Sequence, residues 1–173
     1  NPGFCDRATD VLLNEPTCDG LLELFRANDF SRTRPHRQVP EAAIDFVQIA
    51  RDEGPNIIQD FHENMNVRGG NLHAVLADIC AFINTNGGSL FIGVSSDSHK
   101  PVAGIANPEQ AIKQIEKEVE NRISPPAHIS LDIQKHMNLS VIRILIPRGE
   151  EAPYALDENK IYIRDEDETN IAV

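Results

Sequence analysis

The feature that most constrains the fold is a helical pattern that ends at two glycines and continues directly into an apolar strand. Apolar residues recur at helical spacing from Leu72 to Ile83, which indicates a helix that buries one face, and Asn71 is expected to cap its start. Asn86-Gly87-Gly88 ends that helix, and the run from Ser89 to Val94 is typical of a buried central strand. A helix and a strand joined in this way predict a sheet with the helix packed on it.

The rest of the second half supplies another helix and further strands. Asn107-Pro108 begins a helix with Ile112, Ile115 and Val119 on its apolar side. The remaining predicted elements are a short strand at 102–105, a hairpin of strands 129–133 and 142–146 that turns at 135–138, and a last strand at 160–164. We therefore predict an α+β domain in which two principal helices pack on one mixed sheet.

Residues 1–54 predict a helical N-terminal extension. Short apolar clusters lie at 10–14 and 21–25, and Thr17 or Asp19 is available to cap the second cluster as a helix. A further helix is expected over 41–51, and Gly54-Pro55 ends it. We place the domain boundary there, which gives an extension of residues 1–54 and an α+β domain of residues 55–173.

The charge distribution limits which partners the chain can bind. The net charge is −11, and residues 149–173 carry 2 basic against 8 acidic side chains. Nucleic-acid binding depends on cations that neutralise phosphates, so we expect weak binding by this chain alone. Arg32, Arg34 and Arg37 lie in a polar, proline-interrupted loop and are the candidate phosphate contacts. The alternative interpretation of this loop is a solvated linker.

Other residue patterns give no sign of a cofactor or a membrane span. Cys5, Cys18 and Cys80 lack metal-ligand spacing, and the six histidines are scattered, so no zinc site is expected. No apolar run approaches the roughly 20 residues that a membrane helix needs. The first residues show neither an initiator Met nor a signal-peptide pattern. We expect a cytoplasmic bacterial protein without cofactors, and a chain that is part of a longer protein.

The string AFINTNGGSLFIGV at residues 81–94 resembles the signature of the Schlafen-type AlbA-like family. Further pieces follow in the family's order: Val102–Ile105, Ile123-Ser124-Pro125, the paired strands, Ala152-Pro153-Tyr154 and Ile161–Arg164. The similarity covers about two thirds of the chain. Bacterial members of this family are commonly transcriptional regulators or DNA-binding proteins with additional domains. The resemblance therefore implies a nucleic-acid-binding regulatory domain.

The resemblance also implies an alternative, because animal Schlafens include metal-dependent ribonucleases. Those enzymes carry two Glu before the helix, the second in a Glu-Phe-Lys motif, and an Asp just after the Gly-Val strand. Here Asp60 and His62 replace the Glu and Lys of that motif, and Glu53 is out of register with the first Glu. Ser95 and Ser96 occupy the expected acidic positions, with Asp97 one residue later. Under this alternative, Glu53, Asp60, Glu63 and Asp97 would hold a divalent cation.

Because these positions depart from the family's pattern, we predict a domain with no catalytic residues and no metal site. The third alternative is a protein-interaction or assembly module, which the acidic charge favours, and the run Asp165–Glu168 could attract a basic partner. The expected partners are nucleic acid, other domains of the full-length protein and a second copy of the chain. Gly87-Gly88 joins a helix to a strand, so it predicts a structural turn rather than a phosphate site.

Overall fold

The computed structural model describes residues 9–13, 17–27, 31, 33–35, 45–66 and 69–172. It divides into two compact units, Asn1–Ala43 and Ile44–Val173. The smaller unit contains strand β1 (Thr9–Val11), helix α1 (Cys18–Ala27) and strand β2 (Thr33–Pro35), and the two strands pair antiparallel. The Thr17 hydroxyl accepts a hydrogen bond from the Gly20 N–H at 3.1 Å, so Thr17 caps α1.

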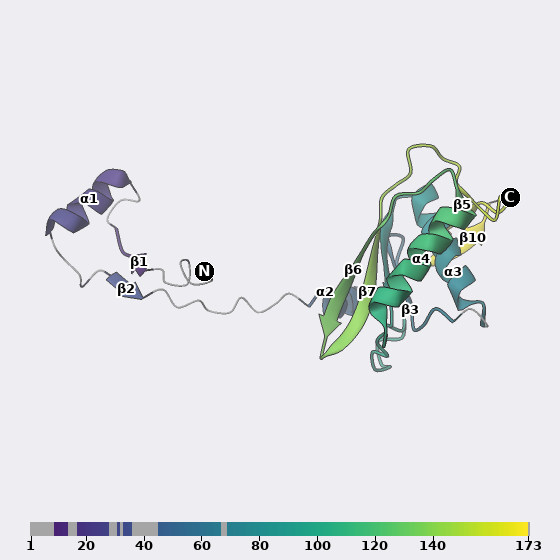
Figure 1. Ribbon diagram of the computed structural model, residues 1–173, viewed down its shortest axis with the longest axis horizontal. Coiled ribbons are helices and arrows are strands. Elements are labelled where there is room, and N and C mark those ends of the chain that lie inside the picture. Colours follow the sequence, from purple (N-terminus) through teal and green to yellow (C-terminus); the bar gives the residue numbers. More distant parts are fainter. Residues whose placement is uncertain are drawn as a thin grey trace. The chain divides into compact units, whose positions relative to one another are not determined.

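The larger unit is built on a mixed four-stranded sheet in the order β3-β4-β7-β6, as predicted for the α+β class. β3 and β4 are parallel, whereas β4 pairs antiparallel with β7 and β7 with β6. The sheet strands are β3 (Gln59–His62), β4 (Gly88–Ile92), β6 (Ser130–His136) and β7 (Leu139–Ile146). The β6–β7 pair is the predicted hairpin, and its long strands are prominent in Figure 1.

Three helices and two small strand pairs complete this unit. The helices are α2 (Phe46–Glu53), α3 (Asn71–Asn84) and α4 (Pro108–Arg122). The short strands are β5 (Ile123–Ser124) with β8 (Ala155–Leu156), and β9 (Tyr162–Asp165) with β10 (Glu168–Ile171). Among the described residues, no helix is both long and apolar enough to cross a membrane.

Side-chain alternation along the strands divides the core between the two faces of the sheet. Leu90 and Ile92 of β4 face α3 and α4, together with Ile142, Ile144 and Ile146 of β7. Phe61 of β3 and Phe91 of β4 face the other way and stack with ring centroids 5.5 Å apart. The predicted helices α3 and α4 therefore share one core, and a smaller cluster lies on the opposite face.

Helix α2 covers that opposite face, although we predicted it as part of the extension that ends at residue 54. Val47 and Ala50 are buried in the cluster of Phe61 and Phe91. Asp45 caps the helix by accepting from the Gln48 N–H, and its other oxygen lies 2.8 Å from Nδ1 of the buried His136. The larger unit consequently begins at residue 44, because the apolar side of α2 packs on the sheet.

Three local features differ from the sequence-based expectations. Residues 102–105 form no strand, because the Ala103 and Gly104 N–H groups both donate to the Gly93 carbonyl instead of alternating along a ladder. Strand β3 was not predicted, because Gln59-Asp60-Phe61-His62 contains a single apolar residue and so lacks the apolar pattern of a strand. Asn71 is the first residue of α3 and not its cap; Gly70 stands at the cap with φ 76°.

The turn at Gly87-Gly88 is packed too tightly to admit side chains. Gly87 has φ +71°, and a Cβ there would lie 2.6 Å from the Ile146 carbonyl oxygen. A Cβ on Gly88 would lie 2.5 Å from the Ile58 carbonyl oxygen and 2.8 Å from Cδ1 of Phe82. The turn is therefore enclosed by the chain on both sides, which explains why two glycines join α3 to β4.

Gly88→Ala is expected to lower the free energy of unfolding by about 1–3 kcal/mol or more, because its methyl group would overlap the backbone. The matched control is Gly69→Ala, where the nearest atom to a Cβ lies 3.6 Å away, in ordinary contact. Urea unfolding of both variants measures the difference. Equal midpoints for Gly88→Ala and Gly69→Ala would contradict the packing described for the turn.

Candidate functional site

The carboxyl ends of the parallel strands β3 and β4 meet at one edge of the sheet. This is the edge at which open α/β sheets bind their ligands. A cavity of about 330 Å³ opens there, which we call the carboxyl-edge cavity. Its lining residues are Phe61, His62, Glu63, Asn64, Asn71, Ser95, Ser96 and Lys100. It lies where the ribonuclease alternative would place its carboxylates.

Asp60 lies on β3, one residue before Phe61 of the cavity lining, and forms an ion pair with Arg164 of β9. The Arg164 Nη1 donates to Asp60 Oδ2 at 2.6 Å and to the Thr169 hydroxyl at 3.2 Å. Nη2 donates to the Asn56 carbonyl at 3.1 Å. The side chains are 1% exposed for Arg164 and 17% exposed for Asp60, so the pair is almost withdrawn from water.

Burial raises the pKa of the Asp60 carboxyl above its ordinary value, although the Phe61 N–H and the Arg164 charge oppose that rise. The nearby Asp78 carboxylate also raises the pKa of Asp60. Arg164 stacks over the Phe82 ring, with the guanidinium carbon 5.1 Å from the centroid. The carboxylate at the Glu-Phe-Lys position is therefore used to compensate a buried cation within the protein.

Asp78 pairs with His62, the residue that replaces the family's lysine. His62 Nε2 lies 2.6 Å from Asp78 Oδ2, and their side chains are 19% and 10% exposed. Asp78 comes from the middle of α3, and His62 ends β3. The two residues connect the principal helix to the carboxyl end of the strand and leave little of either polar group open to solvent.

The two outer carboxylates each have a basic partner of their own. Glu63 lies 3.2 Å from the Lys100 ammonium, whose hydrogen bond lowers the pKa of that carboxyl. Asp97 accepts from the His99 N–H at 3.0 Å, and this bond lowers the pKa of Asp97. The Asp97 charge opposes the lowering of the Glu63 pKa, but its effect is the smallest of those that act on Glu63.

The loop after β4 is held against α2 by an arginine. Arg51 Nη2 donates to the Ser98 carbonyl at 2.7 Å and to the Lys100 carbonyl at 2.6 Å. Ser95 is buried, and its hydroxyl accepts from the Asp97 N–H at 3.2 Å. The position from which the family's Asp would reach inward therefore carries a neutral hydroxyl, while the Asp97 side chain is exposed.

The residues that the ribonuclease alternative requires have separate surroundings in the structure. Glu63 lines the carboxyl-edge cavity, Asp97 is exposed in the loop after β4, and Asp60 is engaged by Arg164 on β9. Glu53 is exposed in the last turn of α2. In the part of the chain that the structure describes, no three His, Cys, Asp or Glu side chains form a group that could hold a metal ion.

The candidate phosphate contacts are described only in part. Arg34 lies in strand β2 and not in a loop as predicted, and the strand register places it opposite Asp10 of β1. Arg32 and Arg37 lie outside the described residues. These three arginines belong to the smaller unit, and their role in binding stays a prediction.

Sequence reasoning missed Asp78 and the role of Arg164. Asp78 is 7% exposed in a helix of which ten residues are buried, so an acidic residue within an apolar helix was the available signal. Arg164 stands within the string Ile161–Arg164 that supports the resemblance. No feature of the sequence indicates that its partner would be Asp60, 104 residues away.

The chain belongs to the Schlafen AlbA_2 family, whose model matches residues 57–172. This match begins just before β3 and includes the Gly87-Gly88 turn, the hairpin and Arg164. It confirms the resemblance predicted from residues 81–94. A search of curated proteins found no significant match.

Two solved structures are similar to the larger unit. The DIP2311 protein from Corynebacterium diphtheriae has a TM-score of 0.53 and 16% identity over 67% of this chain, which covers 22% of that protein. The N-terminal domain of a Nitrosomonas europaea protein described as related to the ATP-dependent DNA helicase RecG has a TM-score of 0.47 and 15% identity. The latter match covers 58% of this chain and 71% of that domain. At this identity the DIP2311 match shows a shared fold.

Arg164→Gln is expected to lower the free energy of unfolding by about 3–5 kcal/mol, because it leaves Asp60 as an unpaired, nearly buried carboxylate. Replacing both partners, as in Asp60→Leu with Arg164→Met, should recover much of that loss. Chemical denaturation at pH 7 measures both effects.

The matched control is Lys100→Gln, which neutralises an exposed ion pair and should leave the stability close to that of the parent. A loss for Arg164→Gln no larger than that for Lys100→Gln would show that the Asp60–Arg164 pair is not needed for folding.

Proposed function

We propose that this chain is the non-catalytic part of a larger cytoplasmic bacterial transcriptional regulator, and that it contacts nucleic acid weakly through Arg32, Arg34 and Arg37 of its smaller unit. The observation that carries the non-catalytic assignment is the buried ion pair of Asp60 with Arg164. Membership of the Schlafen AlbA_2 family supports the regulatory role by resemblance. The chain spans about a fifth of the DIP2311 protein, 22% of its length, which is consistent with one domain of a longer protein.

Phosphodiester cleavage by a bound cation requires several carboxylates that converge within about 2.0–2.6 Å of the ion. Here Asp60 is engaged by Arg164, Glu63 by Lys100 and Asp97 by His99. A cation would have to displace these partners before it could be bound by the three carboxylates. The cost is greatest at Asp60, because Arg164 would then be left as a buried charge without its counter-ion.

Several cations of the larger unit are engaged by the protein itself, whereas others, such as Lys113 and Lys117, are exposed. Each of the following five cationic side chains has a hydrogen-bonding partner within the protein: Arg51, Lys100, Arg122, Arg143 and Arg164. Engaged cations neutralise phosphates less readily, since the existing partner must be replaced. This distribution favours Arg32, Arg34 and Arg37 of the smaller unit as the phosphate contacts.

A metal-dependent ribonuclease is the second candidate, and one observation favours it. Glu63 lines the carboxyl-edge cavity together with Ser95 and Ser96, and the charges of Glu63 and Asp97 repel each other weakly. A divalent cation placed between them would relieve that repulsion. Under this candidate Glu53 and Asp60 would complete the site, which requires the Asp60–Arg164 pair to open.

The nuclease alternative is tested by Mn²⁺ titration together with incubation on a structured RNA hairpin. We expect no cleavage above the background of the Asp97→Asn variant, because neutral Ser95 and Ser96 stand where the family's acidic residues would bind the ion. A second variant, Glu63→Gln, controls for cation binding at the outer pair alone. Cleavage that requires both Asp60 and Asp97, with Mn²⁺ bound by both, would replace our proposal with the ribonuclease.

Binding to a 20-base-pair DNA duplex should be weak at physiological salt, with a Kd in the non-specific range of roughly 10⁻⁴–10⁻⁶ M. The triple variant Arg32→Gln, Arg34→Gln, Arg37→Gln should bind more weakly still. The slope of its log Kd against the logarithm of the salt concentration should be smaller by about 2–3. Fluorescence anisotropy at several salt concentrations measures both quantities.

The charge-matched control is the triple variant Lys113→Gln, Lys117→Gln, Lys160→Gln, which removes three exposed cations from the larger unit. It should bind more tightly than the arginine variant. If the lysine variant loses binding and the arginine variant does not, the contact lies on the larger unit and the three arginines are not the phosphate contacts.

A further inference from the structure

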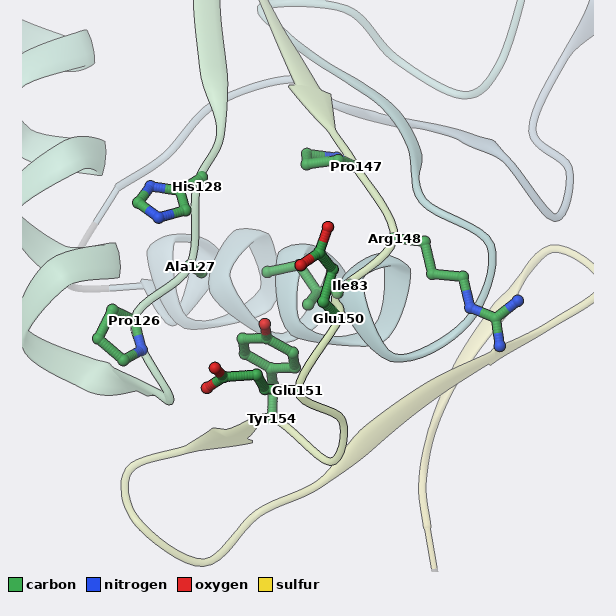
Figure 2. A pocket seen from close by; sticks show the side chains of 10 residues that line it. Ile83, Pro126, Ala127, His128, Pro147, Arg148, Glu150, Glu151 and Tyr154 are labelled. Carbon is green, nitrogen blue, oxygen red and sulfur yellow. The ribbon is translucent and has the colours of Figure 1, made fainter.

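A second cavity, of about 510 Å³, lies at the opposite end of the sheet from the carboxyl-edge cavity. It opens where β7 ends and β4 begins, at the pair formed by Ile146 and Gly88. Figure 2 shows its lining residues, which come from the segment before β6, the segment after β7 and the last turns of α3. They are Ile83, Pro126, Ala127, His128, Pro147, Arg148, Gly149, Glu150, Glu151 and Tyr154.

Tyr154 lies within this cavity and is rigidly held by its backbone. Its N–H donates to Asn84 Oδ1 at 2.7 Å, and its carbonyl accepts from Asn84 Nδ2 at 2.8 Å. The residue is 6% exposed, yet its hydroxyl forms no hydrogen bond with the residues that the structure describes. In Figure 2 the hydroxyl points into the space between the lining side chains. The hydroxyl oxygen itself is not enclosed by the protein, so it is open to a hydrogen-bonding partner that enters the cavity.

The position of the Tyr154 ring depends on a glycine. A Cβ on Gly149 would overlap Cε2 of Tyr154 and lie 2.7 Å from Cγ2 of Ile83. The Gly149 N–H also donates to the Ile83 carbonyl at 2.8 Å, which fixes this segment on the end of α3. The Tyr154 ring therefore fills a space that the side chain of any other residue at position 149 would occupy. The ring and the Gly149 segment form the base of the cavity.

The rim of the cavity is acidic and its walls are apolar. Glu150 and Glu151 are exposed, and neither carboxylate forms an ion pair within the described part of the chain. In Figure 2 their carboxylates lie to either side of Tyr154, whereas Arg148 extends away from the cavity. Ile83, Pro126, Ala127 and Pro147 supply apolar surface. The site thus combines two carboxylates, a hydroxyl acceptor and apolar walls, and the His128 imidazole also lines it.

We propose that this cavity binds an arginine side chain of a partner protein. The aliphatic stem would pack on Ile83 and the prolines, and the guanidinium would donate to Glu150, Glu151 and the Tyr154 hydroxyl oxygen. Arginine fits better than lysine, because its planar fork has enough donors to serve three acceptors at once. The net charge of −6 over residues 149–173 attracts a basic segment to this end of the domain.

The binding test uses the whole chain and two matched peptides, Ac-Gly-Arg-Gly-NH₂ and its neutral isostere with citrulline in place of arginine. Isothermal titration calorimetry should detect the arginine peptide and show affinity at least tenfold lower for the citrulline peptide. The affinity should also fall as salt rises. Equal binding of the two peptides, or binding that salt does not weaken, would overturn the proposal.

Variants of the cavity separate binding from stability. Tyr154→Phe should lower the affinity for the arginine peptide about tenfold, as for the loss of a hydrogen bond to a charged group. Its thermal midpoint should match that of the parent, since the hydroxyl has no partner to lose. The double variant Glu150→Gln, Glu151→Gln should also lower the affinity, whereas Glu116→Gln on the exposed side of α4 should not. An unchanged affinity in Tyr154→Phe and in the double Glu variant would refute the assignment.

Two further measurements locate and identify the ligand. The chain has two tyrosines and no tryptophan, so Tyr162→Phe leaves Tyr154 as its single fluorescent reporter. The arginine peptide should change the Tyr154 emission, and an unchanged emission despite calorimetric binding would place the site elsewhere. Free L-arginine has the same net charge as the capped peptide but lacks its flanking peptide groups, so a site for a protein side chain should bind it more weakly than the peptide. Equal or tighter binding of free arginine would overturn the assignment to a protein partner.

Discussion

Arg164 brings a full positive charge to a position where its side chain is 1% exposed, and the surrounding chain must compensate that charge. Asp60 supplies the counter-charge, the Asn56 carbonyl and the Thr169 hydroxyl supply acceptors, and the Phe82 ring covers one face of the guanidinium. These groups come from β3, from the segment before it, from the C-terminal hairpin and from α3. The ion pair therefore fixes the last part of the chain against the first strand of the sheet.

The same pair decides what the carboxyl-edge cavity can do chemically. A carboxylate bound to a buried guanidinium is a weak candidate for a metal ligand, because releasing it leaves the cation without compensation. His62 and Asp78 extend this pattern, since the basic residue at the end of β3 is engaged by an acid from α3. Membership of the family accounts for the fold of this domain. Metal-dependent cleavage depends on whether the acidic residues are free to bind a cation. Here the nearest basic groups of the protein already pair with them.

The features that the sequence predicted depend on interactions between neighbouring residues, and the features that it did not predict depend on contacts between residues far apart in the chain. The apolar face of α3, the Gly87-Gly88 turn and the β6–β7 hairpin rest on local patterns, and each was predicted from neighbouring residues. Helix α2 was predicted as a helix but assigned to the extension, because its burial against Phe61 and Phe91 is a long-range contact. The polar strand β3 lacked the alternation of apolar residues on which strand prediction depends. At the site, Asp60 was singled out from the motif, while its partner Arg164 could only be found in three dimensions.

The two ends of the sheet differ in how their polar groups are satisfied, and this difference bears on where the domain can bind a partner. At the carboxyl edge, Glu63 and Asp97 face basic groups of the same chain, so an external ligand must compete with them. At the other end, Glu150 and the Tyr154 hydroxyl surround a cavity without such internal competition in the described structure. Binding free energy is the excess of new interactions over those they replace. An external cation therefore gains more at the end near Tyr154, although the cavity considered for the ribonuclease alternative lies at the opposite end.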